Sequence, residues 1–203
     1  MSLKILPAFI VFVLLITFNI KRYARRSHND EKNFWARETQ ANSVRRKSLD
    51  GLKYISIPLE TFPTNLLGDN PAVAECIDIV QSLAAQKIVN LTGWSNTDLK
   101  LEYGTANITA LSQYDQNYTL LARTLQKWAD ALIEAGYSEE AVALMEFAID
   151  TETDVSRTYY QLAEYWSSKG EPDRIEHLIR TAKNLRSANR NSIVRHLSEF
   201  HTS

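Results

Sequence analysis

A 34-residue internal repeat near the C-terminus constrains the fold of this chain more than any other feature. Ala129 and Gly136 recur 34 positions later as Ala163 and Gly170. The same offset relates a further set of mostly apolar residues: Leu125, Trp128, Leu132 and Ala148 correspond to Tyr159, Leu162, Trp166 and Ala182. A fixed period of this size is typical of stacked helical hairpins. We expect the alanines to allow close helix contact and the glycines to end each first helix.

With the repeats counted from Ala122 and Ser156, the order of large and small residues resembles that of the tetratricopeptide repeat (TPR) family. The resemblance covers residues 115–203. It departs from the family pattern at Thr153 and Ser187, which replace the proline near the end of each repeat. The resemblance implies a solenoid of α-α hairpins that binds other proteins and has no chemistry of its own. An unrelated packing of four helices is the alternative.

An apolar run occupies residues 3–20, where Lys4 and Asn19 are the only strongly polar side chains. About 18–20 apolar residues are enough to cross a lipid bilayer. A cleaved signal peptide is the competing interpretation, but no pair of small residues marks a cleavage site after the run. The pattern therefore predicts an uncleaved transmembrane anchor over residues 1–20.

Four basic residues follow this run: Lys21, Arg22, Arg25 and Arg26. Because positively charged flanks stay in the cytoplasm, we expect a single-pass protein of the cell membrane with residues 21–203 inside. This layout resembles that of small membrane-anchored bacterial proteins. Residues 21–50 are interpreted as a basic juxtamembrane stalk or linker. Three of its residues are candidates for contact with anionic lipid, or for a solvated linker: Arg45, Arg46 and Lys47.

Residues 51–114 are expected to pack on the repeats as an extended segment, a helix and a loop. Two prolines keep the apolar stretch 52–59 extended. Asn70 followed by Pro71 marks the start of a helix, because asparagine is a good N-cap and proline suits the first helical position. The stretch 92–114 is loop-like and holds three notable polar residues: Asp98, Glu102 and Tyr103. An enzyme or a regulatory subunit with its site in residues 52–113 is therefore an alternative function.

The repeat region itself is expected to form five helices, over residues 116–135, 138–150, 155–169, 172–184 and 189–200. The last of these has one apolar face and suits a helix that closes the end of a solenoid.

No sequence motif indicates chemistry. Phosphate-binding glycine loops and paired zinc-ligand motifs are absent, so we expect no catalytic residues, no metal site and no cofactor. Cys76 lies in an apolar helical pattern and is expected to be a buried, inert thiol. The net charge is −1, which argues against nucleic acid as a partner for the chain as a whole. Three glycosylation sequons, at Asn90, Asn107 and Asn117, are interpreted as chance matches.

Charged side chains recur on the first helix of each repeat, on the side that faces the peptide-binding groove in the TPR family. The resemblance implies that six residues contact a partner: Arg123, Lys127, Asp130, Arg157, Tyr160 and Glu164. Arg123 and Arg157 are expected to bind acidic groups. Asp130 and Glu164 stand where family members that bind a free C-terminus carry asparagine, which argues against that ligand. Local ion pairs on a solvated helix are the alternative.

Taken together, the sequence predicts a mainly α protein in which a transmembrane helix precedes a TPR-like solenoid. The expected function is a membrane-anchored scaffold or adaptor that binds a protein or peptide partner without catalysis. A helical repeat that contacts RNA is a second alternative to the enzyme. Three basic residues near the C-terminus would then make the contact: Arg186, Arg190 and Arg195.

Overall fold

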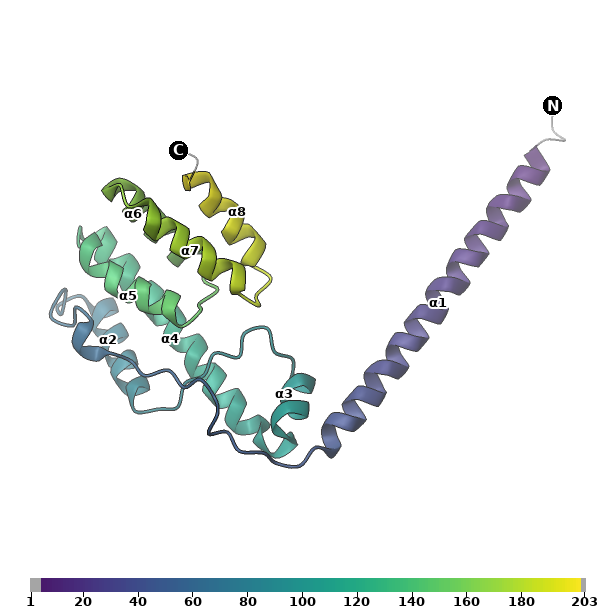
Figure 1. Cartoon of the computed structure of the whole chain (residues 1–203), viewed down its shortest axis with the longest axis horizontal. Helices are drawn as coiled ribbons and strands as arrows, with labels where there is room; N and C mark the ends of the chain where they lie inside the picture. Colours follow the sequence, from purple (N-terminus) through teal and green to yellow (C-terminus); the bar gives the residue numbers. More distant parts are fainter. Residues whose placement is uncertain (1–4, 202–203) are drawn as a thin grey trace. The chain divides into compact units, whose positions relative to one another are not determined.

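A computed structural model describes residues 5–201 of the chain (Figure 1). The described chain is mainly helical, as the sequence predicts. Its elements, in order, are α1 (Ile5–Ser43), η1 (Leu59–Thr61), α2 (Pro71–Ala84), α3 (Asn96–Tyr103), η2 (Thr105–Asn107), α4 (Ile108–Glu134), α5 (Ser138–Asp150), α6 (Ser156–Lys169), α7 (Pro172–Asn184) and α8 (Arg190–His201). The helices alone do not assign the chain to the TPR family, and that resemblance stays a prediction.

The predicted transmembrane anchor is wrong. Among residues 5–201, no helix is long and apolar enough to cross a membrane. The apolar run is the first part of α1, a single helix of 39 residues whose second half is rich in charged residues. Residues 1–4 of the predicted anchor lie outside the described residues. The fold class is therefore corrected to mainly α, without the transmembrane helix.

The chain divides into two compact units that are not consecutive in sequence. The first unit combines residues 1–47 with 95–108, and the second combines 48–94 with 109–203.

In the first unit, the end of α1 packs against α3 and η2. Arg37 pairs with Asp98, and Glu38 pairs with Lys100. The side chain of Asn107 is 1% exposed and joins the segments. Its Nδ2 atom donates to the carbonyl oxygens of Lys47 and Tyr103, at 2.8 and 2.7 Å. These bonds tie the chain that follows α1 to α3.

In the second unit, α4 and α5 form one helical hairpin and α6 and α7 form the next, followed by α8. Gly136 and Gly170 have positive φ angles, of 88° and 70°, at the turns where the sequence places them. In α2, the Asn70 side chain accepts a hydrogen bond from the backbone of Ala72, which is the expected N-cap.

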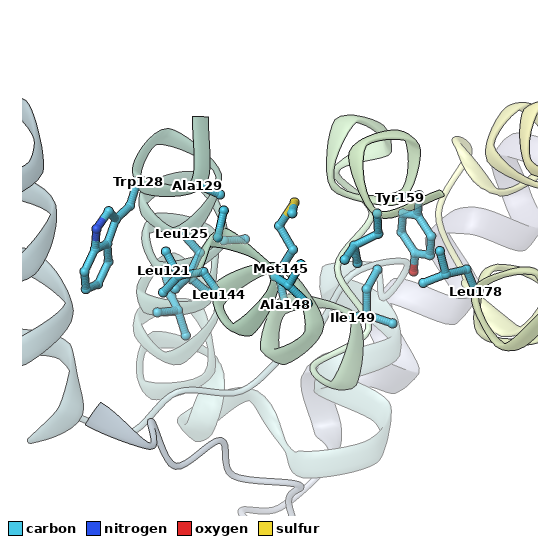
Figure 2. Packing of buried hydrophobic residues seen from close by; sticks show 14 of the residues in the cluster. Leu121, Leu125, Trp128, Ala129, Leu144, Met145, Ala148, Ile149, Tyr159 and Leu178 are labelled. Atoms are coloured by element: carbon cyan, nitrogen blue, oxygen red, sulfur yellow. The ribbon is translucent and has the colours of Figure 1, made fainter. Parts of the chain in front are cut away.

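One apolar core runs through the second unit. In Figure 2 its side chains follow one another from α4 through α5 to α6 and α7. The repeated alanines Ala129 and Ala163 are fully buried, which lets neighbouring helices approach. Trp128 is also fully buried, and its ring meets that of Phe62 at 6.0 Å between centroids. Phe62 comes from the extended segment before α2, so this segment shares the core of the hairpins.

Candidate functional site

The six predicted partner-binding residues lie on two helices of the second unit. Arg123, Lys127 and Asp130 belong to α4, whereas Arg157, Tyr160 and Glu164 belong to α6. Their environments differ, and only Arg123 and Glu164 are exposed residues without an ion-pair partner in the part of the chain that the structure describes.

Asp130 and Arg157 belong to a polar network that joins α4 to α6. The Oδ1 atom of Asp130 accepts hydrogen bonds from Arg157 Nε at 2.8 Å, Gln161 Nε2 at 2.7 Å and Gln126 Nε2 at 2.9 Å. Thr158 Oγ1 donates to Gln126 Oε1 at 2.6 Å. We call the surface formed by Gln126, Asp130, Arg157, Gln161 and Glu164 the α4–α6 face. Because Arg157 already pairs with Asp130, it is not a vacant anchor for an acidic partner.

Lys127 forms an ion pair with Glu75 of α2. The hydrogen bond from Lys127 lowers the pKa of the Glu75 carboxyl, and the same bond raises the pKa of Lys127. Both side chains are more than half exposed, so the pair contributes little to stability.

Tyr160 contacts the last helix of the chain. Its ring lies 3.9 Å from that of His196 in α8, measured between centroids. The ring of Phe200 lies 5.4 Å from His196 on the same helix. Tyr160 is therefore half-buried in the packing of α8 on α6.

Glu164 lies at a pocket of about 340 Å³ between the two hairpins. The pocket is lined by residues of α4, α5 and α6, namely Ile133, Ser138, Met145, Gln161, Glu164, Tyr165 and Ser168. We call it the Glu164 pocket. Its volume is near the lower end of the range for small-ligand sites, and it combines apolar walls with a few polar groups. It adjoins the polar network, because Gln161 belongs to both.

The polar residues proposed for an enzyme site have structural roles or remain apart. Asp98 accepts from the backbone and hydroxyl of Ser95 in a capping box at the start of α3, and these bonds lower the pKa of its carboxyl. Its other oxygen pairs with Arg37. Glu102 is exposed and Tyr103 is half-buried in the same helix. None of the three lines a pocket described here.

Two further pockets were not predicted from the sequence. They share Asn90 and Glu152 and measure about 200 and 260 Å³. Glu152 has a left-handed backbone, with φ at 61°, and its carboxylate pairs with Lys53 at 2.8 Å. The Asn90 amide donates to the carbonyl oxygens of Thr151 and Glu152. These residues thus hold the α5–α6 turn against the extended segment.

Several predicted contact residues for lipid or RNA have partners within the chain. Arg46 donates to Asn107 Oδ1 at 3.1 Å, and Lys47 donates to the carbonyl of Leu101 at 3.4 Å. The Arg186 guanidinium lies over the ring of Trp94, with its central carbon 5.1 Å from the ring centroid.

Over the described residues, no group of three or more histidine, cysteine, aspartate or glutamate side chains is arranged to hold a metal ion. Cys76 is buried, and this burial raises the pKa of its thiol. No family model, characterised protein or solved structure matches this chain. The candidate site therefore depends on its own geometry.

Proposed function

We propose that this chain is a helical-repeat interaction module that binds a segment of another protein on its α4–α6 face. The observation that carries the proposal is the Glu164 pocket, which opens between two helical hairpins beside the hydrogen-bonded network of Asp130. The network holds α4 and α6 together, because the Asp130 carboxylate accepts one hydrogen bond from a residue of α4 and two from residues of α6. A surface held in this way is pre-organised for binding.

Binding is favoured over catalysis because no set of reactive groups converges in the Glu164 pocket. Its lining holds one carboxylate, two serine hydroxyls, one amide and a tyrosine beside apolar side chains. A serine nucleophile needs an adjacent base, and the lining contains no histidine or lysine to serve as one. The same groups are suited to hydrogen bonding and to apolar contact with a peptide.

Site-specific photo-crosslinking in the native cell tests this proposal. The crosslinker p-benzoylphenylalanine would replace Arg123 of α4 or Ser167 of α6, or Arg180 of α7 as the control. All three residues are exposed, and Ser167 lies three residues after Glu164 on the same side of the helix without lining the pocket. We expect the same partner protein to be captured from the first two positions and not from Arg180. Equal capture from all three positions, or none from the first two, would contradict the proposal.

A further inference from the structure

We infer that the Glu164 pocket binds an arginine side chain of the partner segment, with the guanidinium on the Glu164 carboxylate. This inference rests on the proposed function and specifies the chemistry of the ligand. It commits to one occupant, an arginine within an extended or helical peptide of a second protein.

The first argument is charge. The sequence from Asp130 to Asp154 contains eight carboxylates and no lysine or arginine. Three of the eight carboxylates form ion pairs with basic residues from outside this stretch: Asp130, Glu146 and Glu152. Glu134 directly follows Ile133 of the pocket lining, and Glu139 directly follows Ser138; both are exposed. Lys169, which directly follows Ser168 of the lining, is the one basic residue adjacent in sequence to a lining residue. Glu134, Glu139 and Glu164 outnumber it, so the charge next to the pocket is net negative and attracts a cation.

The second argument is the position of the hydrogen-bond acceptors. Gln161, Glu164 and Ser168 lie on one stripe of α6, because residues three and four apart share a helix face. The hydroxyl of Ser168 donates to the carbonyl of Tyr165 at 2.7 Å, so its oxygen still has lone pairs to accept with. A guanidinium carries five N–H donors in a planar fork and can bond to several such acceptors at once, whereas an ammonium is a point charge.

The third argument is the apolar wall. Ile133 and Met145 line the pocket from α4 and α5. The methylene stem of an arginine can cover such a wall while its head stays at the polar rim. Neighbouring residues show that this end of α6 accepts cations: Lys169 lies over the Tyr165 ring at 5.3 Å, and the Arg174 guanidinium lies over Trp166 at 4.8 Å. Because Lys169 already covers the Tyr165 ring, the guest cation is assigned to Glu164.

The sequence supplies a specific reporter for this pocket. The chain has two methionines, Met1 and Met145, so labelling with [¹³C-methyl]methionine gives a simple spectrum of the full chain. The Met145→Leu variant assigns the pocket signal. The probes are N-acetyl-arginine amide, N-acetyl-lysine amide and N-acetyl-citrulline amide. Citrulline has the shape of arginine without its charge.

We expect the Met145 methyl signal to shift in a saturable manner with the arginine probe. Binding should weaken about fivefold to tenfold with the citrulline probe and in Glu164→Gln, because a charge-assisted bond is lost. The Glu176→Gln variant, which alters an exposed glutamate of α7, should bind as the wild type does. An unshifted signal, or citrulline or lysine binding as tightly as arginine, would overturn the inference.

This titration separates the two proposals, since it needs no partner protein. Crosslinking at Arg123 and Ser167 together with an unresponsive Met145 signal would leave the proposed function standing and reject arginine as the ligand. A responsive Met145 signal without specific crosslinking would support the arginine pocket and reject the α4–α6 face as a protein-binding surface.

Discussion

Two glycines of the second unit share a backbone conformation but not their surroundings. Gly93 and Gly136 have φ angles of 84° and 88°. A Cβ atom at Gly93 would lie 2.6 Å from Arg186 Cβ and 3.0 Å from its carbonyl oxygen, whereas at Gly136 it would meet open space. A residue that carries a Cβ atom is destabilised by about 1–2 kcal/mol when its backbone adopts the left-handed conformation.

We therefore expect Gly136→Ala to lower the free energy of unfolding by about 1–2 kcal/mol. Gly93→Ala should lower it further, because the backbone near Arg186 must also move. Urea unfolding of the two variants beside the wild type gives both values. Equal losses would show that contact with Arg186 does not restrict position 93.

Two buried tyrosines make the fold sensitive to alkaline pH. Burial raises the pKa of Tyr118 to about 12, although its hydroxyl donates to the Thr151 carbonyl at 3.1 Å. Burial also raises the pKa of Tyr159, whose hydroxyl donates to the Thr153 carbonyl. A raised pKa in the folded state means that the stability is complete below the unfolded value, near 10, and is lost as pH rises through the folded value.

For Tyr118 this loss is about 2–3 kcal/mol between pH 10 and 12, at 1.36 kcal/mol per pKa unit. Between pH 9 and pH 11 the wild type should lose about 1 kcal/mol of this stability, and the Tyr118→Phe variant should not lose that part, as measured by urea unfolding at the two pH values. An identical pH dependence in the two proteins would mean that Tyr118 ionises freely in the folded state.

At the scale of the helices, the polar network between α4 and α6 is the feature to test. Asp130→Ala removes the acceptor shared by Gln126, Arg157 and Gln161, and we expect it to cost about 1–2 kcal/mol of unfolding free energy. Arg157→Ala should cost less than about 1 kcal/mol, because its side chain is 61% exposed.

The control is Arg123→Ala, an exposed arginine of α4, for which we expect a change near zero. A double-mutant cycle between positions 130 and 157 isolates their coupling. A coupling energy of zero would mean that the ion pair across the helices does not stabilise their arrangement.

Local signals were sufficient for several helix ends. The bounds of α5 and α7 agree with the predicted ranges, 138–150 and 172–184. The signals for their starts are Gly136, Gly170 and Pro172, which lie within a few residues of the helix ends. The start of α4 was missed: it begins at Ile108, not at residue 116. Its first turns contain threonine, serine and asparagine, which are weak helix formers, so burial of Leu111 and Tyr118 decides the helix there.

Part of the candidate site could also be predicted from the sequence, because helical spacing is a local signal. Helical spacing places Arg123 and Asp130 on α4 and Glu164 on α6, and the structure has them on those helices. The hydrogen bond from Arg157 to Asp130 joins two residues that are 27 positions apart and lie on different helices. Spacing within one helix cannot predict it. The Glu164 pocket likewise depends on how three helices meet.

At the scale of the whole molecule, the first unit is assembled from distant parts of the chain. Arg37 and Glu38 reach Asp98 and Lys100, and Arg46 reaches Asn107, which lies 61 residues further along. Charge and helix signals in a sequence are local, so they predict residues 21–50 and 51–114 as successive segments. Pairings over such separations appear only in the fold.

This arrangement predicts what removal of α1 would do. A chain that begins at Ser48 loses Arg37, Glu38 and Arg46, the partners of α3 and η2, but keeps the apolar core of the second unit. An eight-residue helix is marginal in water without tertiary packing, so α3 should unfold.

Hydrogen exchange resolves the effect by segment, because protection reports local opening. In the truncated chain, amides of residues 96–107 should exchange at rates close to those of an unfolded peptide, while α4 from Tyr118 onward, α5 and α6 stay protected. Arg123→Ala in the full chain is the matched control, since it removes an exposed side chain of α4 and no partner of α3. Protection of residues 96–107 without α1 would show that α3 is stabilised by contacts other than those with Arg37 and Glu38. A uniform loss of protection would show that the second unit cannot fold without α1.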